Sequence, residues 1–140
     1  MSYVDLHVHS NASDGTLSPE QVVRLAHEAG LSAIALTDHD TTAGVAGAAE
    51  AGAELGLEVV PGIEVSSSFR DHEIHILGLF VDTDSPSLQA ALKEFRHHRD
   101  QRNQEMLGRF DAHGIHLTAE DLCAGNPDTV ITRAHVARAL

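Results

Sequence analysis

Two histidines stand close together near the start of the chain, in a segment whose alternating pattern predicts a β-strand. Residues 4–10 read Val-Asp-Leu-His-Val-His-Ser, and in a strand every second side chain points to the same face. His7 and His9 therefore share one face of the strand with Asp5, and the apolar residues between them point to the opposite face. Two imidazoles on one strand face are suited to bind a metal ion. The alternative is a pair of hydrogen-bonded histidines.

Histidine and acidic residues also follow the next predicted strands. Asp14 lies in the polar loop after the first strand, His39 follows the apolar strand 33–37, and Glu64 comes near the end of the strand 58–65. Asp14 has an alternative role, because aspartate in a Ser-Asp-Gly turn commonly bonds to its own backbone.

The elements between these residues predict an α/β fold with a parallel sheet. Ser18, Pro19 and Gln21 form a capping-box pattern that begins a helix, and Gly30 ends it. An alanine-rich helix over about 43–55 follows the second strand. Strand, loop and helix in succession imply right-handed crossovers, and such folds bind ligands at the C-terminal ends of their strands.

A fourth strand, 73–79, alternates and places His75 on one face. We therefore expect side chains from separate strand ends to meet at one edge of the sheet and form a polynuclear metal site. The candidate ligands are His7, His9, Asp14, His39, Glu64 and His75. A buried polar network is the alternative.

The composition of the chain limits the classes of protein to which it can belong. A chain of 140 residues is enough for one domain with a core. The formal net charge of −12 argues against a surface that coats nucleic acid, because such binding is carried by Lys and Arg. Cys123 is the only cysteine, which rules out an internal disulfide and a multi-cysteine zinc site. With no secretory leader and no apolar run of membrane-spanning length, we expect a cytoplasmic protein that makes no use of a membrane.

A long helix beginning at Ser85-Pro86 carries a stripe at three-four spacing that includes two arginines, Arg99 and Arg102. Arginine on an otherwise apolar stripe needs a partner, and its planar fork suits phosphate oxygens. The alternative is that both guanidinium groups reach solvent or an acid such as Glu105. The remaining histidines are expected at the surface: His27, His72, His97, His98, His113 and His116.

Taken together, these motifs resemble the PHP family, the polymerase and histidinol phosphatase superfamily of metal-dependent phosphoesterases. The matching segments are Asp5-Leu6-His7-Val8-His9-Ser10, Ser13-Asp14-Gly15, Thr37-Asp38-His39-Asp40, Pro61-Gly62-Ile63-Glu64-Val65-Ser66 and His75-Ile76-Leu77-Gly78. The resemblance implies a distorted (β/α)7 barrel with a three-metal cluster. His7 and His9 would hold the first ion and Asp14 and His39 the second. Glu64 would bridge the first ion to a third that His75 also binds.

The resemblance extends to a subgroup that dephosphorylates nucleoside 3',5'-bisphosphates and trims short RNA from its 5' end. In that subgroup Arg99, Arg102, Arg133 and His135 are expected to contact substrate phosphate. The implied partner is a small phosphorylated nucleotide, with short RNA as a second possibility. The reaction is phosphomonoester hydrolysis by a metal-bound hydroxide; no residue of this chain is singled out as the catalytic group. The implied cofactors are two or three divalent ions, Mn first, with Zn and Fe as alternatives.

The resemblance also implies a division of the chain and a missing part. Residues 1–84 would be the first strands and metal-ligand loops of the barrel, and residues 85–140 a long helix and helical insertion. The family's later ligands, a His and then an Asp-x-His, are not in this sequence, so we expect the chain to be the N-terminal half of a longer protein. Alternative functions are a histidinol-phosphate phosphatase, a polymerase-associated PHP exonuclease, and a noncatalytic metal-binding module.

Overall fold

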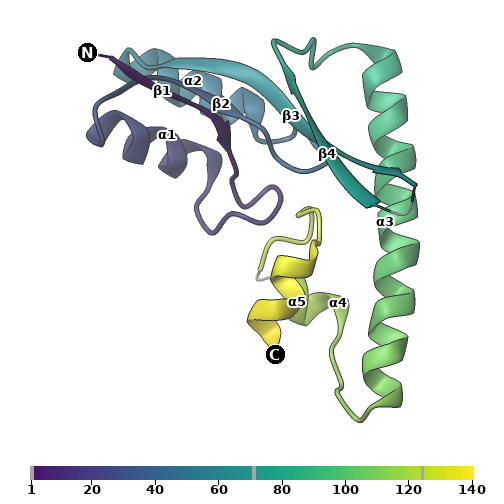
Figure 1. Ribbon diagram of the computed structural model, residues 1–140. Helices are drawn as coiled ribbons and strands as arrows, with labels where there is room; N and C mark the ends of the chain where they lie inside the picture. The colour runs from purple at the N-terminus through teal and green to yellow at the C-terminus, as the bar shows by residue number, and fades with distance from the viewer. Residues whose placement is uncertain (1, 71, 124) are drawn as a thin grey trace.

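A computed structural model describes residues 2–70, 72–123 and 125–140. The strands form one sheet in the order β1-β2-β3-β4. The first two helices of the chain lie beside the first strands, and the C-terminal helices lie toward the other end of the sheet (Figure 1). The elements are β1 (Tyr3–Val8), α1 (Pro19–Glu28), β2 (Leu31–Leu36), α2 (Val45–Leu55), β3 (Glu58–Phe69), β4 (His72–Leu79), α3 (Pro86–Ala112), α4 (Ala119–Cys123) and α5 (Arg133–Ala139).

The first three strands form the predicted parallel arrangement. β1 pairs with β2 and β2 with β3, both in parallel, and α1 and α2 make the crossovers between them. The Ser18 side chain accepts from the backbone of Gln21, and the Gln21 side chain accepts from the backbone of Ser18. This capping box satisfies donors that the first turn of a helix leaves free, so the predicted start of α1 is confirmed.

The hydrophobic core lies between the sheet and these two helices. Val23 of α1, Ile34 and Leu36 of β2, and Ala48 of α2 have no solvent-exposed surface. Burying one large aliphatic side chain contributes about 1.5–3 kcal/mol, so β2 is the best-anchored strand of the sheet. The ends of β1, β2 and β3 are thereby held in fixed positions relative to one another.

The fourth strand departs from the parallel pattern. β4 pairs with β3 in antiparallel fashion, with Glu64 opposite Leu77 and Ser66 opposite His75. Only two residues of sequence separate β3 from β4. A parallel pair needs a crossover of a dozen residues or more, so this short connection permits only a hairpin. The sheet is therefore mixed, with three parallel strands and one antiparallel strand, and the predicted α/β fold class is confirmed.

The loop after β1 is held by the C-terminal part of the chain. Val130 donates its backbone N–H to the Ala12 carbonyl at 2.9 Å, and the Thr129 hydroxyl donates to the Ser13 carbonyl at 2.8 Å. The Asn126 side-chain amide donates to the Asn11 carbonyl at 2.9 Å. Backbone groups of this loop thus find partners more than a hundred residues away along the chain.

Helix α3 presents its predicted stripe to the rest of the molecule. Leu92 and Arg99 are buried, and the other stripe positions, Leu88, Phe95, Arg102, Met106 and Phe110, are half-buried. The histidines expected at the surface are exposed: His27, His72, His97, His98, His113 and His116. The division at residues 84 and 85 into barrel and helical insertion stays a prediction.

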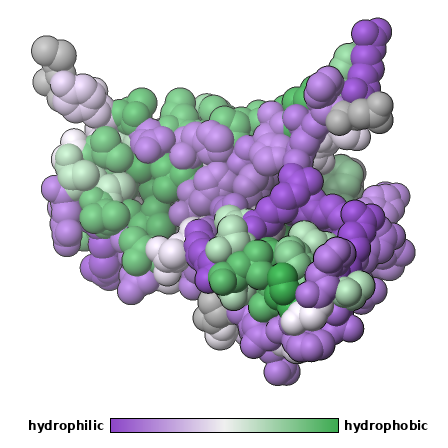
Figure 2. All heavy atoms as spheres, turned by 60° about the horizontal axis from the view of Figure 1, so that its bottom comes forward, coloured by the Kyte–Doolittle hydropathy of each residue, from purple (hydrophilic) through white to green (hydrophobic). Residues whose placement is uncertain are grey.

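Apolar side chains are also exposed on the two outer strands. They are Tyr3, Val4 and Leu6 of β1, and Ile74, Ile76 and Leu77 of β4. On the face shown in Figure 2, a hydrophilic band separates two groups of apolar residues. Within the described ranges, no helix combines the length and the apolar character that crossing a membrane requires.

Candidate metal centre

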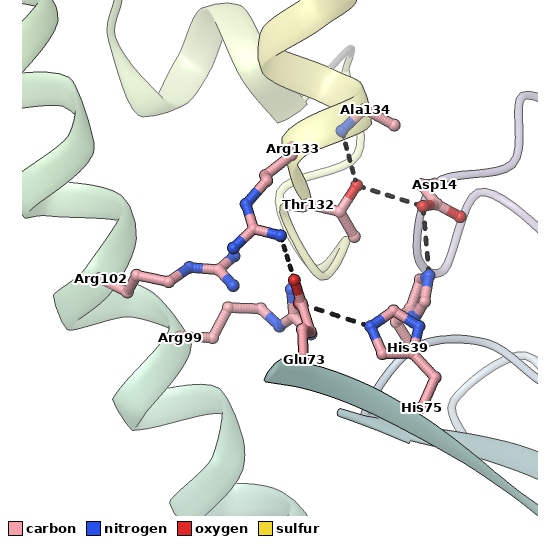
Figure 3. Close-up of a pocket in the computed structure, with 9 residues that line it drawn as sticks. All are labelled: Asp14, His39, Glu73, His75, Arg99, Arg102, Thr132, Arg133 and Ala134. Carbon is pink, nitrogen blue, oxygen red and sulfur yellow. Dashed lines mark hydrogen bonds and ion pairs between the residues drawn. The ribbon is translucent and has the colours of Figure 1, made fainter. Parts of the chain in front are cut away.

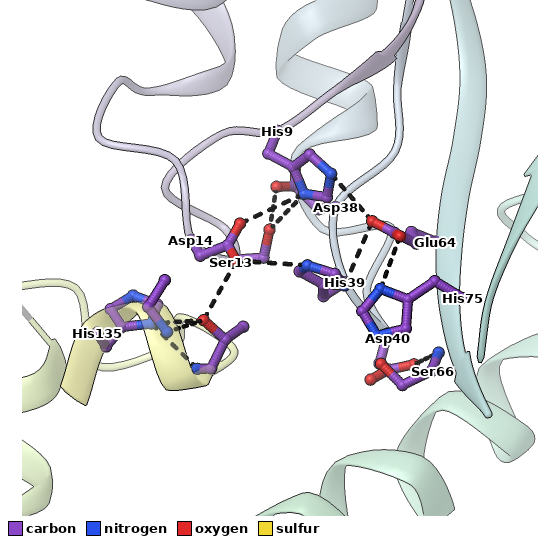
Figure 4. Close-up of polar contacts among 12 residues, drawn as sticks. His9, Ser13, Asp14, Asp38, His39, Asp40, Glu64, Ser66, His75 and His135 are labelled. Carbon is purple, nitrogen blue, oxygen red and sulfur yellow. Dashed lines mark hydrogen bonds and ion pairs between the residues drawn. The ribbon is translucent and has the colours of Figure 1, made fainter. Parts of the chain in front are cut away.

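All six predicted ligands lie together. His7 lies on β1, and His9, Asp14 and His39 lie in the segments that follow β1 and β2, whereas Glu64 and His75 lie inside β3 and β4, because β3 continues to Phe69. Their nitrogen and oxygen atoms form three overlapping groups, and within each group the atoms lie within 4.8 Å of one another. The groups are His7, His9 and Glu64; His9, Asp14 and His39; and His39, Glu64 and His75. Figure 4 shows five of these side chains converging from separate segments of the chain.

Glu64 lies at the centre of this cluster. Its Oε2 is 3.1 Å from His7 Nε2 and 3.0 Å from His9 Nε2, and its Oε1 is 2.8 Å from His75 Nδ1. The backbone fixes its position: Glu64 donates its N–H to the Asp38 carbonyl at 3.2 Å and accepts at its carbonyl from Asp40 N–H at 2.9 Å. A single buried carboxylate therefore contacts two histidines at the end of β1 and one on β4.

Asp14 occupies the other side of the cluster. Its Oδ2 is 3.3 Å from His39 Nε2, and its Oδ1 is 3.4 Å from His9 Nδ1. Asp14 also accepts from the Thr132 hydroxyl at 3.2 Å, which joins α5 to the cluster. Each pair that the family resemblance implied, His7 with His9 and Asp14 with His39, falls within one group, and His9 and His39 each belong to a second group as well. Which ion each residue holds stays a prediction.

The charges in this cluster favour a cation. Burial raises the pKa of Glu64, but hydrogen bonds and charges from His7, His39 and His75 outweigh it and lower that pKa. The hydrogen bond from His39 holds the pKa of Asp14 far below its usual range. Burial lowers the pKa of His39, but contacts with Asp14 and Glu64 outweigh it and raise that pKa. Both carboxylates are therefore ionised at neutral pH, and their charge favours a cation beside them, either a proton on His39 or a metal ion.

The donor set fits a divalent metal ion. His39 Nδ1 is buried and makes no hydrogen bond within the described residues, although it lies 3.4 Å from Glu64 Oε2. A buried ring nitrogen without a partner is costly, and a metal ion between it and the carboxylate would satisfy it. Mixed imidazole and carboxylate ligands suit Mn²⁺, Fe²⁺ or Zn²⁺.

Two buried aspartates beside His39 were not predicted as site residues. Asp38 accepts from Ser10 N–H at 2.8 Å, from the Ser10 hydroxyl at 2.6 Å and from the Ser13 hydroxyl at 2.6 Å. It thereby ties the loop that carries His9 to the end of β2. The sequence shows these aspartates on either side of His39, but it does not indicate which residues they contact.

A pocket of about 140 Å³ opens beside the cluster. Figure 3 shows its wall, in which arginines from α3 and α5 face histidines from β4 and from the segment after β2. The lining residues are Asp14, His39, Glu73, His75, Arg99, Arg102, Thr132, Arg133 and Ala134. Three of the four predicted phosphate contacts, Arg99, Arg102 and Arg133, therefore share one cavity with the candidate metal ligands.

The three arginines differ in how far they are neutralised. Arg99 pairs with Asp40, and Arg133 pairs with Glu73, whose pKa the Arg133 hydrogen bond lowers. Arg102 pairs with no acid in the described part of the chain, and its Nε is buried without a hydrogen-bonding partner there. Burial and the charges of Arg99 and Arg133 lower the Arg102 pKa, so an anion in this pocket would relieve a real electrostatic cost.

His135, the fourth predicted phosphate contact, lies elsewhere. Its Nδ1 accepts from Thr132 N–H at 3.0 Å as part of the capping box of α5, and the residue is buried. It lines a separate cavity next to Asn11 and Cys123 rather than the pocket with the arginines. Its contact with phosphate stays a prediction.

This arrangement, a cluster of histidines and carboxylates on the sheet of an α/β half-barrel beside a cationic pocket, defines a class of protein. A model of the PHP domain matches residues 5–132. The chain therefore belongs to the PHP domain family.

Two relatives match nearly the whole chain. A 3',5'-nucleoside bisphosphate phosphatase from Chromobacterium violaceum is 41% identical over 142 residues, covering 100% of this chain and 50% of the relative. A 5'-3' exoribonuclease from Haemophilus influenzae is 40% identical over 136 residues, covering 97% of this chain and 49% of the relative. The chain thus spans about half the length of these relatives.

The fold has a close counterpart among solved structures. The structure of an amidohydrolase from Chromobacterium violaceum, with bound sulfate and no metal, aligns with a TM-score of 0.90 at 41% identity. The alignment covers 98% of this chain and 49% of that one. The four-stranded sheet is consistent with the predicted part of a PHP barrel.

Proposed function

We propose that the protein to which this chain belongs is a metal-dependent phosphoesterase that hydrolyses a nucleotide phosphomonoester. The observation that carries the proposal is the clustering of all six predicted ligands, in which four histidines contact the Glu64 carboxylate, directly beside a pocket lined by three arginines. A metal site next to a cationic cavity is suited to phosphate hydrolysis, because both stabilise the negative charge on the phosphoryl oxygens.

The side chains have two roles, metal binding and phosphate binding. His7, His9, Asp14, His39, Glu64 and His75 would hold two or three divalent ions, of which we favour Mn²⁺. When bound, such ions polarise phosphoryl oxygens and lower the pKa of a water toward neutrality. Arg102, which has no acidic partner in the described residues, would bind a phosphate oxygen. Arg99 and Arg133 would add charge at the same pocket and hold the substrate in place.

The substrate class follows from the relatives. One acts on nucleoside 3',5'-bisphosphates and one is a 5'-3' exoribonuclease, so we infer that the substrate is a nucleoside bisphosphate or the 5' end of a short RNA. A second phosphate that is not cleaved would find its countercharge in the arginine wall. The strongly acidic surface, with a net charge of −12, favours a small substrate over a long polymer.

The test is release of phosphate from adenosine 3',5'-bisphosphate with Mn²⁺. We would compare the chain with its His9→Ala variant and with His27→Ala, a matched control whose histidine is exposed on α1. The expected result is release by the unchanged chain and by His27→Ala, with a loss of at least about 100-fold in His9→Ala.

Other outcomes separate the alternatives. Cleavage of histidinol phosphate but not of the bisphosphate, by this chain and by a version extended through the later PHP ligands, would overturn the substrate class. Mn²⁺ binding that depends on His9, without turnover of any phosphomonoester by the extended protein, would identify a noncatalytic metal-binding module.

A further inference from the structure

Asp40 is a buried carboxylate that neither the metal centre nor the predicted phosphate contacts explain. It directly follows His39, and only 2% of its surface is exposed. Its φ is 52°, a left-handed conformation that is uncommon outside glycine and that aspartate tolerates better than most residues. The conformation is held because Asp40 N–H donates to the Glu64 carbonyl at 2.9 Å.

Every donor that Asp40 meets comes from another element. Its Oδ1 accepts from Ser66 N–H of β3 at 2.8 Å, and its Oδ2 accepts from Arg99 Nε of α3 at 3.1 Å. Arg99 Nη2 donates to the same Oδ2 and also to the Ser66 hydroxyl at 2.6 Å. The carboxylate thus joins the long helix to β3 at the position where the metal ligands meet.

The geometry divides the guanidinium of Arg99 into two parts. Nε and Nη2 are committed to Asp40 and Ser66, whereas Nη1 makes no hydrogen bond to any described residue. Arg99 is 8% exposed and lines the pocket beside His39, His75 and Arg102. A long, flexible side chain is therefore locked in one orientation with a single donor nitrogen left for a ligand.

We propose that Asp40 is a positioning residue that, together with Ser66, fixes Arg99 so that its Nη1 serves the phosphate subsite of the pocket. The proposal rests on the proposed function, because it takes the ligand of this pocket to be a phosphate group. Asp40 itself does not touch the ligand; it removes the rotamer freedom that Arg99 would otherwise lose on binding. It also links the metal-ligand segment to α3, so the arginine and the ions keep a fixed separation.

The experiment measures binding of inorganic phosphate to the Mn²⁺-loaded chain by titration calorimetry. The variants are Asp40→Asn, Arg99→Gln, the double variant, and Asp100→Asn as a matched control, an exposed aspartate next to Arg99 on α3. We expect Asp40→Asn to weaken phosphate binding about tenfold or more, because an oriented, charge-assisted contact is lost. Its affinity for Mn²⁺ and that of Asp100→Asn for phosphate should change less than about twofold.

The double variant isolates the route of action. If Asp40 acts through Arg99, Asp40→Asn adds less than about twofold in the Arg99→Gln background. An undiminished effect in that background, or unchanged phosphate affinity in Asp40→Asn, overturns the proposal. A wild-type chain that binds Mn²⁺ but no phosphate overturns it too, since Arg99 then serves no anion.

A second variant guards against misfolding of Asp40→Asn. Ser66→Ala removes the other partner of Nη2 and should weaken phosphate binding about two- to threefold; an unchanged affinity counts against the proposal.

The proposed function can fail separately from the role of Asp40. Asp40-dependent phosphate binding without turnover of adenosine bisphosphate, even by the extended protein, would leave the role of Asp40 standing and remove the substrate assignment.

Discussion

Glu64 shows how much depends on one side chain in this centre. It is 4% exposed, and its carboxylate lies within 3.4 Å of nitrogen atoms from four histidines. A change at this position should therefore affect ion binding more than a change at any peripheral ligand.

We expect Glu64→Gln to weaken Mn²⁺ binding by more than about 100-fold, because it removes the ligand shared by two of the three groups. The amide keeps the shape of the side chain, so circular dichroism should show the wild-type content of helix. Calorimetric titration with Mn²⁺ checks the affinity. Glu50→Gln, which changes an exposed acid on α2, should bind like wild type; equal losses in both variants would show a general charge effect instead.

His135 gives a prediction on pH. Burial and the nearby charge of Arg138 lower its pKa below the ordinary 6.5. The unfolded chain therefore binds the proton first, and folding stability falls as pH drops through 6.5 toward the folded-state pKa. His135→Gln keeps a capping side chain that does not titrate. Urea unfolding between pH 8 and pH 5 should show a smaller loss of stability in the variant; parallel curves would contradict this.

At the scale of elements, the loop after β1 leaves no room for a side chain at Gly15. A methyl group on Gly15 would lie 2.6 Å from the His9 carbonyl oxygen and 2.8 Å from Ser10 Cα. These atoms belong to the backbone of a candidate ligand and of its neighbour, so they cannot shift away from the methyl group without moving His9. Gly108 in α3 is the opposite case, since a methyl group there meets nothing within 4 Å.

These two glycines form a matched pair. Gly15→Ala should destabilise the fold by about 1–3 kcal/mol through overpacking and weaken Mn²⁺ binding as well. Gly108→Ala should stabilise it by about 0.5–1 kcal/mol, because alanine is the better helix former, and leave Mn²⁺ binding unchanged. Denaturant unfolding and calorimetry on the two variants check both signs. A neutral Gly15→Ala would mean that the loop can open without cost.

The elements also show where sequence reasoning succeeds. Helix α1 follows from local signals, because Ser18, Pro19 and Gln21 act within one turn, and the ligands of β1 to β3 follow because parallel strand ends share an edge. β4 lay outside that reasoning: its direction depends on the length of a connection, and the alternating pattern is the same for either direction. The partner of Arg99 could not be found either, because Asp40 is 59 residues away in the chain and its orientation comes from packing.

At the scale of the whole molecule, the metal centre joins segments that the core alone does not connect. Its ligands come from β1 and the loop after it, from the segment after β2, and from β3 and β4. An ion that binds only the folded chain stabilises every segment that supplies a ligand. Metal content should therefore be visible in thermal unfolding.

Adding Mn²⁺ at about 100 times its dissociation constant should raise stability by about 2.7 kcal/mol, equivalent to a melting temperature roughly 10 °C higher. Excess EDTA should reverse the shift. His9→Ala should lose most of it, and His27→Ala should keep it. A shift that survives in His9→Ala would place the stabilising ion elsewhere on the chain.

The contacts between the loop after β1 and the C-terminal segment carry a consequence for the order of folding. Thr132 bonds to Asp14 across 118 residues, and Arg138 donates to the Asp14 carbonyl at 2.6 Å across 124. Contacts of such separation close large loops and form late. During synthesis on a ribosome, β1 emerges first, yet the bonds of its loop cannot all form until Arg138 has emerged. We therefore expect Asp14 to become a competent ligand only after residues 126–138 have emerged, so that ion capture follows synthesis of the segment instead of guiding it.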